Sequence, residues 1–390
     1  MKVVISGAFR FNRNEAAQPR VLSIAKILRG LGHDVVFVCW SGDYLQRERV
    51  ENKHYKQGFE YSISGDLPDN TPIGFVKRLR MFALRGNQSI ATILSYHPDI
   101  VIGYNAPLYF SSEMLRLGKK HKFRFVNDIT EWFDASEFIG GKWLPFAWSD
   151  DFNMKYFQRK VKNKIVISSF LDRYYDSNNV VIPPLIDFEE EKWRRTTPDE
   201  IDFDGVTIVF AGYAGMKDLL KTIIDGVCDS FSKGAKVKFL IVGADRMQIC
   251  ELMGGENFEK FSQTIIPCGR VSQDEVPQYY AKASFSFIIR KPIRKNMAGF
   301  PTKFAESMAA GCPVIANVTS DLVEYIANGY NGFIIEDWSV ACISSTISSI
   351  SRMDKSKINR MKQAAWNTGR EKFSYTNYYE SMDRFLNQCK

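Results

Sequence analysis

The 390-residue sequence lacks several features that would each have decided its class. No apolar run approaches the ~18 residues that a bilayer-spanning helix needs, and the N-terminal segment lacks a signal-peptide layout. The seven cysteines are scattered without a CxxC pair, and the four histidines show no HxxH or HxxxH spacing. Neither a disulfide framework nor a metal site is indicated. We therefore expect a cytoplasmic protein with reduced thiols, no bound metal and no cofactor.

The composition is that of a folded protein whose positive charge is unevenly distributed. Hydrophobic residues make up 45% and charged residues 25%, which excludes bulk disorder, and the length suggests two domains. Residues 1–180 contain 26 Lys and Arg against 18 Asp and Glu, whereas residues 181–390 contain 26 of each. The whole excess of +8 lies in the first half, which suggests an anionic partner there: nucleic acid, a membrane surface or a phosphate-bearing substrate.

Hydrophobic periodicity predicts two alternations of strand and helix, separated by a proline-rich and charged linker at 184–205. The fold class is therefore α/β, with an N-terminal Rossmann-like domain at 1–183, a second one at 206–370, and a C-terminal helix at 371–390 that crosses back to the first. We expect strands at 2–6, 34–40, 99–104, 123–127, 164–168, 180–183, 206–211, 237–243, 265–271, 285–290, 313–316 and 333–335. We expect helices at 19–31, 217–232, 274–283, 302–310, 321–328 and within 354–388.

The most informative segment is GFPTKFAESMAAGCPVIA, at 299–316. Gly299 and Pro301 fit a turn, and a helix follows from Thr302. The N-terminus of such a helix is an anion site, to which Lys303 adds a full charge. Glu306, one turn further along, could accept hydrogen bonds from ribose hydroxyls. Phosphate and ribose together indicate a nucleotide.

Three segments in order resemble those of GT-B glycosyltransferases, in the large retaining group 1 family that uses nucleotide-sugar donors (family 4-like). PTKFAESMAAGCPVIA at 301–316, continued by SDLVEYIANGYNGFII at 320–335, resembles the family's PTK-x-x-E block. VFAGYAGMKDLLKTI at 209–223 is similar to its first strand and glycine-rich loop, and 266–289 to its nucleobase segment. The resemblance implies two Rossmann-like domains facing across a cleft, and a UDP- or GDP-linked sugar as donor.

By this resemblance the donor contacts fall on particular residues. Gly212 and Gly215 would let the backbone approach the diphosphate, and Lys217 would neutralise its charge during transfer. Gly269 and Val271 would border the nucleobase. Lys217 and Glu306 are thus candidate catalytic residues.

The sequence departs from the family pattern at two places. Ala298 stands where members carry an earlier glutamate, so we expect the backbone amides of Ala298, Gly299 and Phe300 to contact the donor sugar. The arginine usual after the first glycine of the loop is also missing. We expect Arg290 or Arg294 to supply that charge.

Acceptor-side candidates lie in the first half. The loop after the first strand carries Arg10, Arg13 and Arg20, which would suit an acceptor phosphate. A strand-end loop carries Asp128, a third candidate catalytic residue, and Glu131, which we place on the acceptor side.

The resemblance implies a metal-independent, retaining hexosyltransferase, in which the acceptor attacks from the front face without a protein nucleophile. The amphipathic segment 75–85 and the basic run 116–124 favour a glycan or lipid-linked acceptor of surface-polysaccharide synthesis, such as lipopolysaccharide or capsule, at the inner membrane face. A nucleotide-sugar epimerase of the same architecture is the alternative among enzymes. A basic nucleic-acid-binding protein is the alternative of another class, although no recognition motif accompanies the charge.

Overall fold

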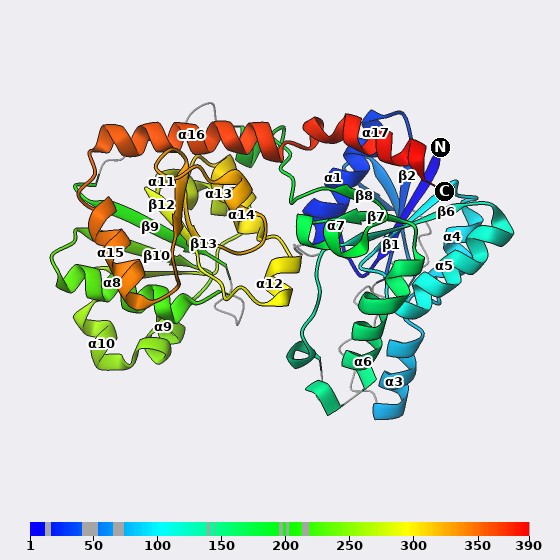
Figure 1. Ribbon diagram of the computed structural model, residues 1–390, viewed down its shortest axis with the longest axis horizontal. Coiled ribbons are helices and arrows are strands. Elements are labelled where there is room, and N and C mark those ends of the chain that lie inside the picture. The colour runs from blue at the N-terminus through cyan, green and yellow to red at the C-terminus, as the bar shows by residue number, and fades with distance from the viewer. Residues whose placement is uncertain are drawn as a thin grey trace. The chain divides into compact units, whose positions relative to one another are not determined.

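The chain forms two compact units in the computed structural model, which describes residues 1–11, 17–40, 54–64, 74–138, 141–143, 145–194, 198–199, 203–212 and 218–389. The first unit comprises Met1–Leu185 and Tyr375–Lys390, and the second comprises Ile186–Ser374 (Figure 1). Each contains a parallel sheet covered by helices, so the predicted fold class is confirmed. In the sequence prediction the chain leaves the first domain at 183–184 and returns to it at 371. In the structure it passes from the first unit to the second at 185–186 and returns at 374–375.

Eight strands form one sheet in the described part of the first unit. They are β1 (Lys2–Gly7), β2 (Asp34–Cys39), β3 (His54–Lys56), β4 (Phe59–Ile63), β5 (Ile100–Tyr104), β6 (Arg124–Ile129), β7 (Asn163–Val166) and β8 (Asn178–Val181). Their order is β3-β4-β2-β1-β5-β6-β7-β8, and all neighbours pair in parallel except β3 and β4. The central strands are almost continuously apolar because helices cover both faces of a parallel sheet.

Side chains of β1 alternate between two apolar layers. Val3 and Ile5 pack with the apolar sides of α1 and α17, whereas Val4 packs with those of α4 and α5 on the opposite face. The helices of this unit are α1 (Ala17–Gly30), α3 (Phe75–Ala83), α4 (Ser89–Ser95), α5 (Leu108–His121), α6 (Pro145–Phe152), α7 (Ser169–Tyr175) and α17 (Tyr379–Gln388). A π-helical turn (Asn153–Phe157) and a 3-10 turn (Gln158–Lys160) continue α6.

The C-terminal helix α17 belongs to the core of the first unit. Its Met382, Phe385 and Leu386 are buried among the apolar residues that cover β1. A Cβ added to Gly30, at the end of α1, would lie 2.4 Å from the Tyr379 ring. Glycine at this position therefore lets α17 pack closely against α1.

Six strands form a parallel sheet in the second unit, as far as the structure describes it. They are β9 (Val206–Ala211), β10 (Val237–Val242), β11 (Ile265–Gly269), β12 (Phe285–Ile288), β13 (Val314–Asn317) and β14 (Gly332–Ile335), in the order β11-β10-β9-β12-β13-β14. Its helices are α8 (Leu220–Ser232), α9 (Arg246–Met253), α10 (Gly255–Lys260), α11 (Val276–Lys282), α12 (Arg294–Ala298), α13 (Thr302–Ala309), α14 (Leu322–Tyr325), α15 (Val340–Ile350) and α16 (Lys355–Phe373).

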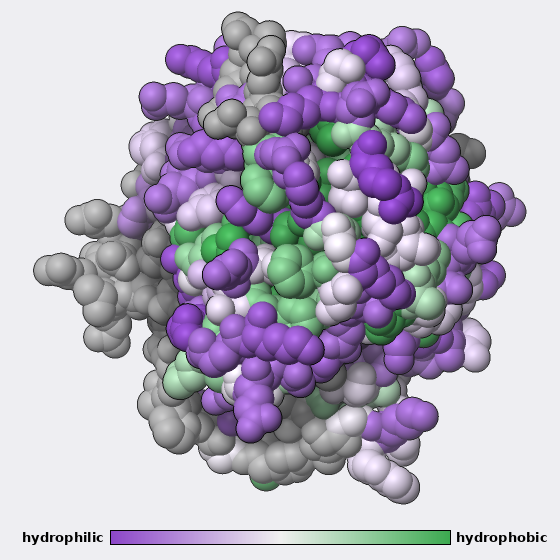
Figure 2. All heavy atoms as spheres, turned by 90° about the vertical axis from the view of Figure 1, so that its left-hand side faces the viewer, coloured by the Kyte–Doolittle hydropathy of each residue, from purple (hydrophilic) through white to green (hydrophobic). Residues whose placement is uncertain are grey.

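One face of the second unit has mixed polarity. Figure 2 shows the side of this unit that carries α8, α10 and α15, where hydrophilic side chains form the rim and apolar side chains gather in the middle. None of the helices in the described ranges combines the length and hydropathy that a bilayer crossing needs.

Two predicted helices differ from those observed. The segment 321–328 is helical only over α14, because the chain turns extended at Ile326. The segment 354–388 divides into α16 and α17, separated by the 3-10 turn Tyr375–Tyr378.

Candidate functional site

The predicted donor residues of the second unit gather where three neighbouring strands end. Gly212 follows β9, Arg290 lies two residues after β12, and Asn317 ends β13. Asn317 fixes the backbone of Arg290: its Oδ1 accepts from the Arg290 amide at 2.9 Å, and its Nδ2 donates to the Arg290 carbonyl at 2.8 Å. Since ligands of open α/β sheets bind beyond the carboxyl ends of the strands, this edge is the candidate site.

A buried carboxylate holds two cations together at this edge. Asp218 Oδ1 accepts from Arg290 Nε at 2.5 Å, and Asp218 Oδ2 forms an ion pair with Lys303 Nζ. The Lys303 ammonium also lies 4.1 Å from the centroid of the Phe210 ring, a cation–π contact. The remaining N–H groups of Arg290 donate to no side chain among the described residues, so they are available to a ligand.

Charge and burial compete within this cluster. Burial opposes ionisation of Asp218, but Arg290 and Lys303 together hold the pKa of its carboxyl below the ordinary value. Burial lowers the pKa of Lys303, and Asp218 partly offsets that effect. Two cations around one carboxylate leave an excess positive charge at the strand ends, which suits an anionic ligand.

Two glycines allow this arrangement. A Cβ on Gly212, whose φ is +148°, would lie 2.5 Å from Lys303 Nζ. A Cβ on Gly243, whose φ is +109°, would lie 2.4 Å from the Gly212 carbonyl oxygen. Gly243 also donates its N–H to the Gly269 carbonyl at 2.7 Å, which ties the end of β11 to the same edge.

The start of α13 presents backbone N–H groups rather than a side-chain cap. Pro301 caps the helix in an extended conformation, and its side chain accepts no hydrogen bond from the first turn. Thr302 is exposed and Lys303 half-buried. The helix end therefore retains its N–H donors and positive dipole for an anion.

Glu306 lies one turn further along α13 and is half-buried. Burial raises the pKa of its carboxyl, while Lys303 and Lys192 oppose that rise. Among the described residues, none donates a hydrogen bond to this carboxylate. Burying part of a carboxylate without a hydrogen-bond donor costs free energy unless a ligand or water supplies the donor.

The other predicted donor residues provide backbone rather than side chains. Ala298 is buried at the end of α12, and the Gly299 carbonyl accepts from Ser320 Oγ at 2.5 Å. The Phe300 ring packs 5.6 Å from Tyr325 and 6.0 Å from Phe373, so it belongs to the core.

Of the remaining predicted residues, the structure describes some and not others. Gly269 ends β11 in the left-handed region, at φ +69°, and Val271 beyond it is half-buried. Arg294, the alternative to Arg290, is exposed at the start of α12. Gly215, Lys217 and Arg13 lie outside the described residues.

In the first unit, Arg20 and Asp128 form a buried ion pair with each other. Arg20 donates to both carboxylate oxygens of Asp128, through Nη2 at 2.7 Å and Nε at 3.2 Å, and through Nη1 to the Ile182 and Pro183 carbonyls. Their side chains are only 7% and 1% exposed. Burial raises the pKa of Asp128, and Arg20 opposes that rise. The donors of Arg20 are thus occupied inside the core, which favours a structural role for this pair over contact with an acceptor.

The other two acceptor-side residues are more accessible. Arg10 and Glu131 are both half-buried, and Glu131 follows the end of β6. The Arg10 carbonyl accepts from Gln18 Nε2 at 2.6 Å, which ties the loop after β1 to α1.

Sequence reasoning missed Asp218 and Gly243. Asp218 directly follows the predicted Lys217, but a carboxylate beside a lysine gives no sign that it will join Arg290, 72 residues away. Gly243 had a usable signal, because it ends a buried strand beside the strand that precedes Gly212.

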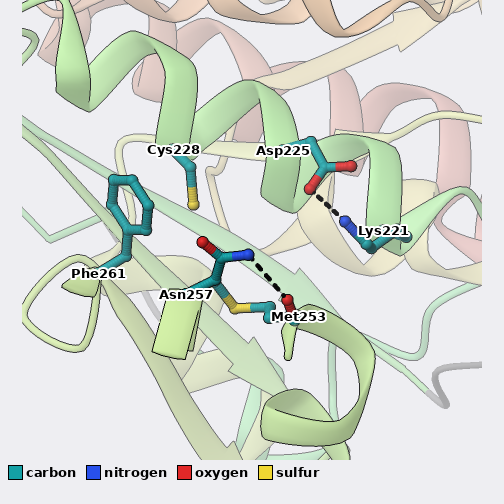
Figure 3. A pocket seen from close by; sticks show the side chains of 6 residues that line it. All are labelled: Lys221, Asp225, Cys228, Met253, Asn257 and Phe261. Carbon is teal, nitrogen blue, oxygen red and sulfur yellow. Dashed lines mark hydrogen bonds and ion pairs between the residues drawn. The ribbon is translucent and has the colours of Figure 1, made fainter. Parts of the chain in front are cut away.

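A pocket elsewhere in the second unit has no part in this site. Figure 3 shows it between α8, α9 and α10, where Lys221 pairs with Asp225 at 2.5 Å and Asn257 Nδ2 donates to the Met253 carbonyl. Burial raises the pKa of the Cys228 thiol there to about 11, so the thiol is not a nucleophile at neutral pH. No group of side chains in the described ranges is arranged to hold a metal ion.

Part of the second unit matches a known protein family. Residues 205–352 match the family described as glycosyl transferases group 1. No curated protein matches the chain.

Solved structures share the fold across the whole chain. Sucrose-phosphate synthase from Thermosynechococcus elongatus is 13% identical at a TM-score of 0.70, covering 99% of this chain and 98% of that one. Anabaena HepE in complex with UDP is 13% identical at 0.71, covering 99% and 100%. The catalytic domain of starch synthase IV from Arabidopsis thaliana, bound to ADP and acarbose, is 13% identical at 0.69, covering 99% of each chain.

The comparisons thus agree with the family recognised from the sequence: residues 205–352 match the group 1 glycosyl transferases, within a chain that has the GT-B fold.

Proposed function

We propose that this protein is a retaining glycosyltransferase that moves a sugar from a UDP- or GDP-linked donor to a glycan or lipid-linked acceptor in surface-polysaccharide or glycoconjugate synthesis. The observation that carries the proposal is the joining of Arg290 and Lys303 by Asp218 beside the start of α13. The group 1 domain covers this edge, and similar folds hold UDP in HepE and ADP in starch synthase IV.

The cation cluster is suited to a diphosphate leaving group. As the bond to the sugar breaks, negative charge grows on the outer phosphate, and fixed positive groups lower the barrier by stabilising it. Arg290, Lys303 and the N–H groups of α13 supply that charge, with Lys217 as the further proposed contributor. Because these groups neutralise the diphosphate themselves, we propose that transfer needs no divalent cation.

Glu306 is suited to the ribose of the same nucleotide. Its carboxylate can accept two hydrogen bonds from vicinal hydroxyls, and it has no donor among the described residues. Glu306 and Lys303 lie on one short helix, three residues apart. Lys303 would therefore contact the phosphate and Glu306 the ribose of one nucleotide.

The carboxylates of the site are poorly placed to act as nucleophiles. Both oxygens of Asp218 are engaged by cations, which lowers its basicity, and Glu306 is assigned to the ribose. For a retaining transfer, as proposed, this favours front-face attack over a covalent intermediate, with the acceptor entering on the side of the departing diphosphate.

The test combines donor binding, turnover and stereochemistry. Purified protein is titrated with UDP, GDP and their sugars by calorimetry, and transfer is followed with glycan and lipid-linked acceptors. The anomeric configuration of the first product is read by NMR. Isomerisation of the donor without an acceptor would instead indicate an epimerase, and inversion would contradict the proposed stereochemistry.

A conservative substitution locates the donor in this site. Glu306→Gln keeps the size of the side chain but removes its charge, and hydrogen bonds to charged groups are worth about 1.5–3 kcal/mol. We expect donor affinity to fall about 10- to 100-fold. Glu336→Gln, an exposed change in the same unit, is the matched control and should bind normally. Equal affinities in the two variants would refute the donor assignment.

A further inference from the structure

An aromatic row lies on the surface of the first unit. We define it as Trp143, Trp148, Phe152 and Tyr156, which lie on α6 and the turns that flank it. Their exposed fractions are 91%, 67%, 51% and 62%. Large aromatic side chains at this exposure normally occur singly, whereas here four fall within fourteen residues.

Three members of the row form one face of the helix rather than a set of unrelated side chains. Trp148, Phe152 and Tyr156 recur every four residues, which places them on one side of the helix. The Phe152 and Tyr156 ring centroids are 5.6 Å apart. These three side chains therefore present joined apolar area to solvent.

The opposite side of α6 anchors it to the protein. Phe146 is buried, and its ring centroid lies 4.6 Å from that of Phe82 on α3. Trp148 is two residues further on, about 200° around the helix axis. The side with Phe146 thus packs on α3, which lies beside α6 in Figure 1, and the aromatic row faces away.

Positive charge is concentrated on the same two helical segments. Residues 74–85 and 141–160 contain eight Lys and Arg but two acids, Asp150 and Asp151, and Asp151 pairs with Lys155 at 2.6 Å. These segments account for six of the eight net positive charges of the whole chain. The exposed cations among the described side chains are Lys77, Arg78, Arg80, Lys142, Arg159 and Lys160.

We propose that α3, α6 and the turns after α6 dock on the surface of an anionic lipid bilayer. Aromatic side chains lie at the headgroup level, where one part is apolar and the other wet, and flanking cations contact lipid phosphates. The density of charge favours lipid over a protein partner, because charged residues as a class are depleted at the centres of protein interfaces. Docking uses no residue of the nucleotide-sugar site, so it stands or falls independently of the proposed reaction.

The test is flotation of the full-length protein with vesicles of phosphatidylcholine, with and without an equal part of phosphatidylglycerol. We expect binding to the anionic vesicles at low salt and its loss at high salt. The triple variant Trp148→Ser, Phe152→Ser and Tyr156→Ser should bind at least tenfold more weakly. Arg159→Gln with Lys160→Gln should weaken binding about fivefold for each charge removed.

Matched controls separate the row from general surface polarity. Tyr55→Ser and Tyr330→Ser remove exposed rings elsewhere, at 68% and 60% exposure, and should leave binding unchanged. Far-UV circular dichroism and the midpoint of urea unfolding should be the same in all variants, which shows that they fold. If the triple variant does not fold, the Arg159→Gln, Lys160→Gln variant tests the proposal by its binding to anionic vesicles.

Three results would overturn the proposal. The first is absence of binding to anionic vesicles, or equal binding by the triple variant and the wild type. The second is a wild-type dimer in light scattering that becomes a monomer in the triple variant, which would assign the row to a second copy of the chain. The third is loss of soluble glycan binding or of salt-sensitive DNA binding in these variants without any lipid dependence.

Discussion

The buried pair of Arg20 and Asp128 allows a sharp test of structural against catalytic roles. Asp128→Asn removes the charge while keeping the shape, and leaves the guanidinium of Arg20 in the core without a counter-ion. Removing one partner of a buried ion pair costs about 3–5 kcal/mol. Both groups are almost fully covered, and their hydrogen bonds join β6 to α1 and to the chain after β8. We therefore take about 4 kcal/mol as the expected loss.

That loss is large enough to measure in several ways. It corresponds to roughly a thousandfold change in the ratio of folded to unfolded protein, because about 1.4 kcal/mol is a factor of ten. For a unit of this size it lowers Tm by about 10 °C. The assay is urea unfolding followed by tryptophan fluorescence, alongside turnover in the absence of urea.

The double variant Arg20→Met with Asp128→Leu is the control. It removes both charges together, so we expect it to recover much of the stability lost in Asp128→Asn. Turnover per folded molecule should stay near normal in both variants. The reasoning is refuted if Asp128→Asn unfolds at the wild-type urea concentration while its turnover falls by orders of magnitude, because Asp128 would then act in the reaction.

Three further predictions concern other parts of the chain. Gly212→Ala should weaken UDP binding in calorimetry, because its Cβ would displace Lys303. The control is Gly234→Ala, at φ +91° with open space around it, which should lower the stability without changing the affinity for UDP. Asp218→Asn frees both cations, so the variant should be less stable without ligand, but UDP should raise its Tm more than that of the wild type; an equal or smaller rise would count against the cluster as a diphosphate site. Burial lowers the pKa of Lys164 to about 8, and because the unfolded chain holds this proton up to a pKa of about 10.4, stability should rise between these pH values by up to about 3 kcal/mol. Lys164→Met should remove that rise in urea unfolding at a series of pH values, and an unchanged slope would contradict it.

The sequence predicted the sheets well because buried parallel strands can be recognised from their local sequence alone. Runs such as VVFVC and VKFLIV are apolar along their whole length, and each predicted strand overlaps an observed one. The segments His54–Lys56 and Phe59–Ile63 were missed because they form the outer edge of the first sheet and are partly exposed. Their mixed polarity gives no strand periodicity.

The candidate site was predictable where its chemistry is local. Pro301, Lys303 and Glu306 lie within six residues on one turn and helix, so spacing alone brought them together. Pairings across long stretches were not accessible to such reasoning. Arg20 and Asp128 are 108 residues apart, and Lys303 and Asp218 are 85 apart, so whether each charge meets a substrate or a partner depends on the folded core.

The return of α17 has a consequence for how the protein is made. During synthesis, residues 1–185 leave the ribosome long before Met382, Phe385 and Leu386, which complete the apolar layer beside α1. The second unit is continuous in sequence and can fold on its own as it emerges, whereas the first must wait for the last residues of the chain. A fragment that stops at 185 would leave that layer open to water and prone to aggregation. Expression of the first unit by itself should therefore require a linker that joins 185 to 375.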